Sequence, residues 1–144
     1  MMSFEEMLEE YLMEEKVENE YQMIFGECET SEEITLKMKE VTEKVLMKDQ
    51  THLTHRFAQA RLNFMVEEKE RLFQEMFLEK SLMKHLLEVE ETAKRFMEME
   101  KSRMMESFGL TEELKAEDWM KWTGLMENLN HELREMAMKE YVYN

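Results

Sequence analysis

The 144-residue sequence contains no proline and only three glycines, Gly26, Gly109 and Gly124. Proline and glycine are the residues that most often break helices and form turns. Their scarcity, in a chain rich in the strong helix formers Glu, Lys, Leu and Met, favours long helices with short connections and argues against a sheet. We therefore expect an all-α protein, a compact bundle of about five to six helices with short loops, built as a single domain.

Cysteine is almost as scarce, because Cys28 stands alone and cannot form an internal disulfide. Its neighbours are Glu27 and Glu29, which offer no positive charge to activate the thiol, so we expect it to be inert in a reducing, cytoplasmic setting. The sequence has no run of 18 apolar residues and no basic flank before an apolar stretch. We therefore expect neither a membrane-spanning helix nor a signal peptide.

Positive charge is deficient at the beginning of the chain. Residues 1–33 hold twelve glutamates and one basic residue, Lys16, which gives a net charge of −11 of the total −15. Residues 34–65 hold six Lys/Arg against three Asp/Glu, which gives +3. Because affinity for nucleic acid depends on cations that meet phosphates, this balance argues against direct DNA or RNA binding. It favours a basic protein surface as the partner.

The acidic stretch is expected to form a first helix over about residues 4–25, between a Ser3/Glu6 capping box and Gly26. Eight glutamates in this helix occupy about 24 Å, or one negative charge per roughly 3 Å, close to the spacing of phosphates along a DNA strand. A mixture of Glu and Lys would give solubility without the repulsion. We interpret the charge as a binding face, with a merely solubilising face as the alternative. The predicted partner-binding residues are Glu5, Glu6, Glu9, Glu10, Glu14, Glu15, Glu18, Glu20, Glu27, Glu29, Glu32 and Glu33.

Helical spacing continues beyond the acidic stretch. Thr30 and Glu33 form a second capping box ahead of an apolar stripe. Asp49 or Thr51 is expected to cap a third helix that runs through Leu53 to about residue 78. The residues of the second stripe are Ile34, Met38, Val41 and Val45.

The C-terminal half begins with an expected restart of the helix at Ser81, and this segment should end at Gly109. Thr111 should open a short helix over residues 112–116, and Asp118 should cap the last one. Gly124 in that helix predicts close approach by another helix or a ring. The parts of the domain are then residues 1–33, 34–108 and 109–144. The last apolar stripe comprises Trp119, Trp122, Leu125, Met126, Leu129, Leu133, Met136 and Ala137.

One stretch of the C-terminal half has a distinctive pattern. It reads Gly-Leu-Thr-Glu-Glu-Leu-Lys-Ala from Gly109, then Trp122-Thr-Gly-Leu-Met-Glu-Asn128, and ends in an aromatic tail at Tyr143. It resembles the TnpV-like family of small transposon-encoded proteins, over about residues 61–143. The resemblance implies a helical fold and a mobile-element origin, and it assigns no catalytic residue. The acidic N-terminal helix departs from the family's pattern.

The sequence lacks the motifs that are typical of catalytic and metal-binding sites. A di-iron bundle needs two Glu-x-x-His pairs and two more carboxylates, whereas this chain offers only Asp49-x-x-His52 and His52-x-x-His55. There is no Gly-x-Ser-x-Gly elbow and no glycine-rich phosphate loop. We therefore expect no catalytic residue, no metal and no cofactor. The 18 methionines are typical of gap-filling core residues, with an adaptable partner surface as the alternative.

Two hypotheses of function follow. The first is a small acidic inhibitor from a mobile element that mimics DNA and occupies the basic nucleic-acid channel of an enzyme, such as a CRISPR effector nuclease. The second is a non-enzymatic transposon accessory protein that binds a transposase or relaxase through apolar helix surfaces. A helical homo-oligomer remains a third alternative. Mimicry should weaken steeply with salt, whereas apolar docking should not.

Overall fold

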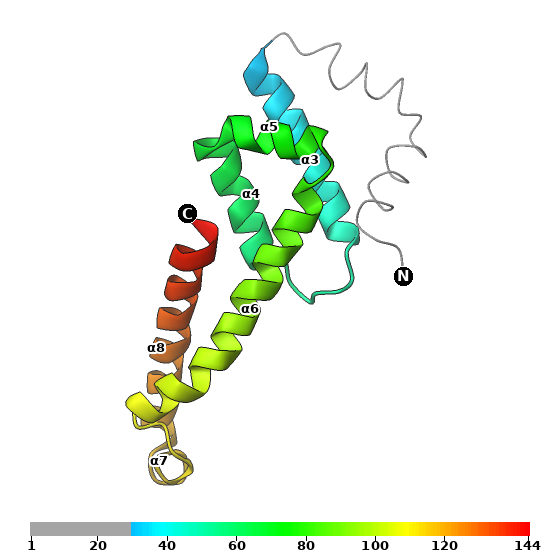
Figure 1. The fold of residues 1–144 in the computed structure, drawn as a ribbon. Helices are drawn as coiled ribbons and strands as arrows, with labels where there is room; N and C mark the ends of the chain where they lie inside the picture. Colours follow the sequence, from blue (N-terminus) through cyan, green and yellow to red (C-terminus); the bar gives the residue numbers. More distant parts are fainter. Residues whose placement is uncertain (1–29) are drawn as a thin grey trace. The chain divides into compact units, whose positions relative to one another are not determined.

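The computed structural model describes residues 30–144, and the predicted first helix over residues 4–25 lies outside this range. The described residues form six α-helices and a C-terminal π-helix, without a strand (Figure 1), which confirms the all-α prediction. The chain divides into two compact units between Glu88 and Val89. The single domain stays a prediction.

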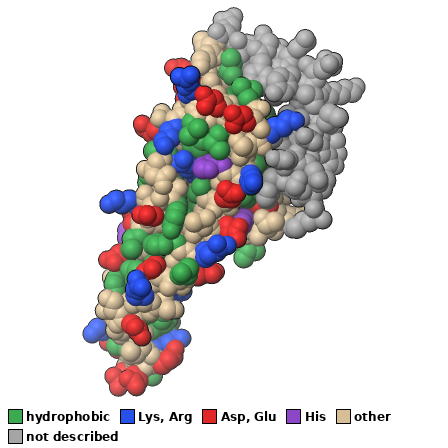
Figure 2. Space-filling view, viewed as in Figure 1, with side chains coloured by type: hydrophobic (Ala, Val, Ile, Leu, Met, Phe, Trp, Pro, Cys, Tyr) green, Lys and Arg blue, Asp and Glu red, His purple; other side chains and the backbone are tan. Residues whose placement is uncertain are grey.

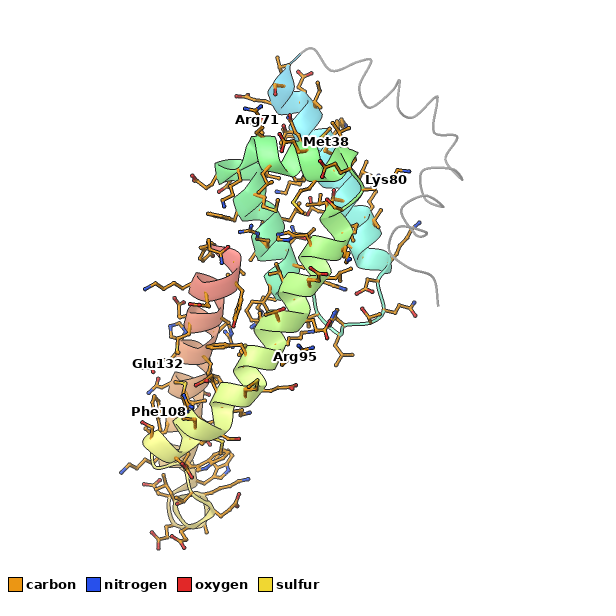
Figure 3. The ribbon with its side chains drawn as sticks, viewed as in Figure 1. Met38, Arg71, Lys80, Arg95, Phe108 and Glu132 are labelled. Carbon is orange, nitrogen blue, oxygen red and sulfur yellow. The ribbon has the colours of Figure 1, made fainter. Side chains whose placement is uncertain are left out.

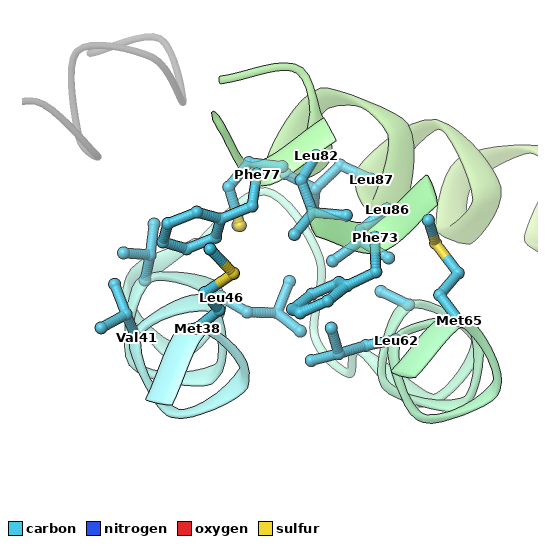
Figure 4. Close-up of a cluster of buried hydrophobic side chains, with 13 residues drawn as sticks. Met38, Val41, Leu46, Leu62, Met65, Phe73, Phe77, Leu82, Leu86 and Leu87 are labelled. Atoms are coloured by element: carbon cyan, nitrogen blue, oxygen red, sulfur yellow. The ribbon is translucent and has the colours of Figure 1, made fainter. Parts of the chain in front are cut away.

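The first unit contains three helices and the beginning of a fourth. They are α3 (Ser31–Lys48), α4 (Arg56–Glu68), α5 (Glu70–Leu78) and the first residues of α6 (Leu82–Ser107). All four contribute to one hydrophobic core, and Figure 4 shows their side chains converging around Phe73. Its ring lies 6.4 Å from that of Phe77, centroid to centroid. Full burial of each large apolar side chain contributes about 1.5–3 kcal/mol, so this core stabilises the unit.

Helix α3 begins where the sequence predicts. The Thr30 side chain accepts a hydrogen bond of 3.2 Å from the backbone N–H of Glu33, which caps the first turn. The predicted apolar stripe faces inward, with Met38, Val41 and Val45 buried and Ile34 half-buried against the core.

The predicted third helix is wrong at its beginning and in its continuity. Neither Asp49 nor Thr51 caps it, because both belong to the loop before α4, whose N-terminal cap is His55. Leu53, expected in the apolar stripe, is fully exposed in that loop. The helix is also interrupted at Lys69, whose ψ of 46° separates α4 from α5. Two short helices can pack on α3 at different angles, which one straight helix could not do.

A left-handed residue separates α5 from α6. Lys80 has a φ of 63°, and the N–H of Ser81 donates 3.0 Å to the carbonyl of Met76. This pattern closes the end of α5 in the manner of a Schellman motif. The restart predicted at Ser81 is confirmed, because α6 begins at Leu82.

The second unit contains the rest of α6, then α7 (Glu112–Glu117), α8 (Trp119–Ala137) and the π-helix η2 (Met138–Val142). Gly109 ends the segment as predicted, with a φ of 69° that favours glycine. Thr111 accepts a hydrogen bond from the N–H of Leu114, and Asp118 accepts one from the N–H of Lys121. Both predicted caps are therefore confirmed.

The core of the second unit joins residues of α6 and α8. Leu129 and Leu133 are fully buried, and half-buried Met97, Met104 and Trp122 pack around them. The predicted stripe is wrong at two positions, because Trp119 is 61% exposed and Met136 44% exposed. The stripe is broad, and its margins extend beyond the residues that gather in this core.

Candidate functional site

Ten of the twelve glutamates predicted to bind a partner lie outside the described residues. The remaining two, Glu32 and Glu33, are exposed in the first turn of α3. Negative charge there is favourable, because the helix dipole presents a partial positive charge at its N-terminus. These two residues therefore have a local role in α3 as well as a place in the predicted binding face.

The basic segment of residues 34–65 contributes lysines to the solvent side of α3. Lys37, Lys44 and Lys48 are exposed there, and exposed Leu36 and Met47 lie on the same helix. The ion pair of Lys37 with Glu40, at 3.5 Å between Nζ and Oε2, is largely exposed and so contributes little to stability. This side of α3 is thus a mixed basic and apolar surface.

A compact polar cluster holds the loop between α3 and α4. The Asp49 carboxylate accepts hydrogen bonds from the Thr51 hydroxyl at 2.8 Å and lies 2.8 Å from Nε2 of His55. Burial would raise the pKa of Asp49, but the hydrogen bonds from His55 and Thr51 outweigh it and hold the pKa below its usual value. The cluster shapes the loop, and Asp49 remains a carboxylate at neutral pH.

A second polar pair lies within the first unit. Arg61 is buried at 4% exposure, and its Nε–H donates a hydrogen bond of 3.2 Å to Nε2 of His85. Burial, together with the positive charge of Arg61, lowers the pKa of His85, whereas Glu88 raises it in part. Neutral His85 accepts at Nε2, so its remaining proton sits on Nδ1.

The beginning of the second unit carries a buried carboxylate. Glu90 on α6 is fully buried, and its Oε1 lies 3.5 Å from Nζ of Lys94 one turn later. The next pair along the helix, Glu91 and Arg95, is exposed, and Figure 3 shows Arg95 extending from α6. Removing the partner of a buried charge costs far more than removing that of an exposed one, so Lys94 has a structural role.

An acidic surface with an exposed tryptophan lies where α7 meets α8. Glu112, Glu113, Glu117 and Asp118 are all exposed, and Figure 2 shows acidic side chains at the end of the unit that holds α7. Trp119 follows directly and is 61% exposed. We call these five residues the α7–α8 acidic surface. An exposed indole among carboxylates fits a basic protein surface that also offers an apolar contact.

Some of the described methionines are buried in a core and others are exposed, so both interpretations made from the sequence apply to part of the set. Met38, Met65 and Met83 are buried in the core of the first unit, as expected of gap-filling residues. Met47 and Met120 are 83% and 81% exposed. The core interpretation therefore holds for part of the set, and exposed methionines add to the apolar surface.

Gly124 does not have the role that the sequence suggests. Apart from its chain neighbours and the nearby backbone of its own helix, a Cβ at this position would have no heavy atom within 4 Å, and the residue is exposed. No part of the described chain approaches it closely, so the prediction of a helix or ring packed on Gly124 within the chain is wrong.

The histidines of the loop are used for structure. His55 contacts Asp49, and the ring of His52 lies 6.2 Å from that of His55 in an edge-on arrangement. Among residues 30–144, no three His, Cys, Asp or Glu side chains gather in a way that could hold a metal ion. None of the helices described is long and apolar enough to cross a membrane.

Sequence reasoning missed the buried polar groups. Arg61, His85 and Glu90 were not singled out as a group, and neither was the cluster in which Thr35 donates 2.7 Å to Glu70 and accepts 2.8 Å from Gln74. A signal was available at Arg61 and Glu90, because each occupies a position of the apolar periodicity of its helix. Their burial still depends on neighbours that are distant in the sequence.

Comparison with known proteins gives one family. The model of the transposon-encoded protein TnpV matches residues 41–142, whereas no curated protein and no solved structure matches the chain. The matched range covers the C-terminal part of α3, all later helices and the π-helix, and it leaves out the acidic residues 1–33. The expected resemblance is thereby confirmed, and the chain belongs to the TnpV family of transposon-encoded proteins.

Proposed function

We propose that this protein is a non-enzymatic accessory protein of its transposon, which binds a transposase or relaxase through the α7–α8 acidic surface. Membership of a transposon-encoded family supports the setting. The observation that carries the proposal is Trp119, which is 61% exposed and directly follows the acidic residues of α7. Tryptophan is among the residues most enriched at the energetic centres of protein interfaces.

The chemistry of the α7–α8 acidic surface defines the partner. Enzymes that handle DNA carry Lys and Arg to meet its phosphates. The exposed carboxylates of Glu112, Glu113 and Glu117 would steer such a surface toward Trp119. The indole would then supply the apolar contact that sets the dissociation rate. Charge thus governs the approach, and Trp119 governs the lifetime of the complex.

The binding test uses the purified full-length chain with the transposase and the relaxase of the same element. Trp119→Ala should weaken binding about thirtyfold, as expected for a residue at the centre of an interface. Leu78→Ala is the matched control, because Leu78 is 59% exposed on α5 and belongs to the other unit. The proposal fails if neither enzyme binds at low salt, or if Trp119→Ala binds as tightly as the wild type.

A second variant separates charge from apolar contact. Glu112→Gln, Glu113→Gln and Glu117→Gln together keep the caps Thr111 and Asp118 and remove three negative charges. The association rate should fall, and its dependence on ionic strength should become shallower, whereas the dissociation rate should change little. An unchanged salt dependence of the association rate would show that these carboxylates do not steer the partner.

We also propose a second function, inhibition of a nucleic-acid enzyme by the acidic residues 1–33. What supports it is the net charge of −11, from twelve glutamates and one lysine, in a segment that lies entirely outside the family match. The target would be a basic DNA channel, such as that of a CRISPR effector nuclease. The protein should inhibit DNA cleavage by a purified effector at low salt, and this inhibition should weaken as the salt concentration rises.

The matched variant for inhibition replaces Glu5, Glu9, Glu14 and Glu18 by Lys. It should abolish inhibition of the effector, while Trp119→Ala should leave that inhibition unchanged. Helix content measured by circular dichroism is the control for folding. If the fourfold variant still inhibits, the charge of residues 1–33 does not carry the activity.

A further inference from the structure

Neither close packing nor backbone conformation within the described chain requires a glycine at position 124. Gly124 lies in the interior of α8 (Trp119–Ala137), where glycine is less favourable than alanine. It is exposed, its backbone has no positive φ, and a Cβ would meet nothing within 4 Å. No contact among residues 30–144 requires the absence of a side chain at Gly124. A glycine on a solvent face does, however, allow a second helix to approach α8 closely.

The residues around Gly124 make this face of α8 self-complementary. Met120 and Lys121 lie one turn before it, and Glu127 and Asn128 lie one turn after it, on the same side of the helix. All four are exposed, and Met120 is 81% exposed. In the described part of the chain, Lys121 and Glu127 form no side-chain ion pair. The charges stand at equal distances on either side of Gly124, with opposite signs.

We propose that α8 packs antiparallel against α8 of a second copy of this chain, with the two-fold axis at Gly124. A two-fold interface brings the same patch of both copies together. In this arrangement Lys121 of each copy lies at the level of Glu127 of the other, and Met120 lies at the level of Asn128. Gly124 faces Gly124, so the two backbones approach at the short end of the usual distance between helix axes, about 8 Å.

Charge selects this orientation over the alternative. In a parallel pair, Lys121 would lie opposite Lys121 and Glu127 opposite Glu127, and like charges at an interface disfavour the arrangement. The antiparallel pair replaces both repulsions with two attractions. One helix pair makes a small interface, about 1,200 Å² or less, and the chain carries a net charge of −15, so we expect a weak, reversible dimer.

Disulfide trapping tests the position of the axis. In a Cys28→Ser background, a copy with Met120→Cys is mixed with a copy with Asn128→Cys, so that two thiols lie at the same level and Gly124 is kept. A disulfide needs Cα atoms within about 4.4–6.8 Å. Mild oxidation of the mixture should give a covalent dimer in high yield. Glu132→Cys by itself is the matched control, since it is exposed on the same helix but lies about 12 Å from the axis along the helix, which puts its mate about 24 Å away. Equal cross-linking in the mixture and in the control would overturn the proposal.

Charge exchange tests the pairing, with the dimer measured by sedimentation equilibrium. Lys121→Glu or Glu127→Lys alone should raise the dissociation constant at least about tenfold, because each turns two attractions into repulsions. The double variant should restore the wild-type dimer, and a mixture of the two single variants should form a heterodimer. Circular dichroism confirms folding of each variant. A wild type that stays monomeric at about 1 mM, the dissociation constant that corresponds to an association free energy of about −4.1 kcal/mol, or single variants that dimerise like the wild type, would refute the interface.

Discussion

The Nε–H of Arg61 donates a hydrogen bond of 3.2 Å to Nε2 of His85, so a buried guanidinium is paired with a neutral imidazole. This contact exists only while Nε2 of His85 is unprotonated. Protonation would bring two positive charges together in a partly desolvated place. The first unit therefore contains a group whose protonation opposes folding.

The first prediction concerns the pH dependence of stability. Burial and the charge of Arg61 lower the pKa of His85 in the folded chain, whereas the unfolded value stays near 6.5. The unfolded chain then binds more protons in the window between these values. The free energy of unfolding should have its highest value above a pH of about 6.5, fall as the pH drops below 6.5, and level off below the pKa of His85 in the folded chain.

His85→Gln tests this assignment by urea denaturation across that window. Glutamine keeps an oxygen that can accept from Arg61 but does not titrate, so the fall in stability below pH of about 6.5 should shrink. His131→Gln is the control, because His131 is 71% exposed on α8. If His85→Gln keeps the wild-type profile, another group produces the pH dependence.

The second prediction compares two ion pairs, each spanning one turn of α6. Lys94→Ala leaves the fully buried Glu90 without the ammonium 3.5 Å away, and we expect a loss of about 1–3 kcal/mol. Arg95→Ala should cost at most about 0.5 kcal/mol, because both partners of its pair with Glu91 are more than half exposed. Both values follow from urea denaturation at pH 7. Similar losses for the two variants would contradict the role of burial, and adding Glu90→Leu to Lys94→Ala should restore stability.

The third prediction concerns Asp49, whose carboxylate is 1% exposed and is bound by Thr51 and His55. Its lowered pKa means that its contribution is complete above about pH 3.8 and is lost as the pH falls through the folded value. Asp49→Asn should lose about 1–3 kcal/mol at pH 7 and flatten the acid limb of the stability profile. Glu40→Gln, at an exposed position of α3, should change neither.

The fourth prediction is that substitution by alanine has opposite effects on stability at the two described glycines. Gly124→Ala should raise the free energy of unfolding by up to about 1 kcal/mol, because the Cβ meets nothing and alanine favours the helix. Gly109→Ala should lower it by about 1–2 kcal/mol, because its φ of 69° is strained for any residue with a side chain. Thermal unfolding at low micromolar protein concentration, chosen to lie below the range of the proposed weak dimer, measures both. A shift of the same sign for both variants would contradict this distinction.

Sequence patterns predicted the helices well where local chemistry determines them. Thr111 and Asp118 cap α7 and α8, because a short polar side chain before an apolar run satisfies the free N–H groups of the first turn. The same reasoning failed at Asp49 and Thr51, which have capping side chains but use them on each other and on His55. Local propensity offers alternatives there, and contacts with the rest of the unit choose among them.

The surface candidates show a similar division. Sequence spacing assigned Trp119 to the apolar stripe of the last helix, yet none of the described helices covers it enough to bury it. Gly124 was expected to admit a neighbour within the chain, and it lies open instead. Periodicity gives the direction of a side chain around its helix, but it does not say whether another element lies in that direction.

Composition, matched positions and charge need no coordinates, so the amino-acid sequence alone is enough for the all-α class, the family and the concentration of negative charge in residues 1–33. Which polar groups are buried and paired, as in Arg61 with His85, and which apolar groups are left exposed, as at Trp119, follows only from the folded chain. Burial depends on neighbours brought together from distant positions of the chain, whereas helix formation depends mainly on residues within one or two turns.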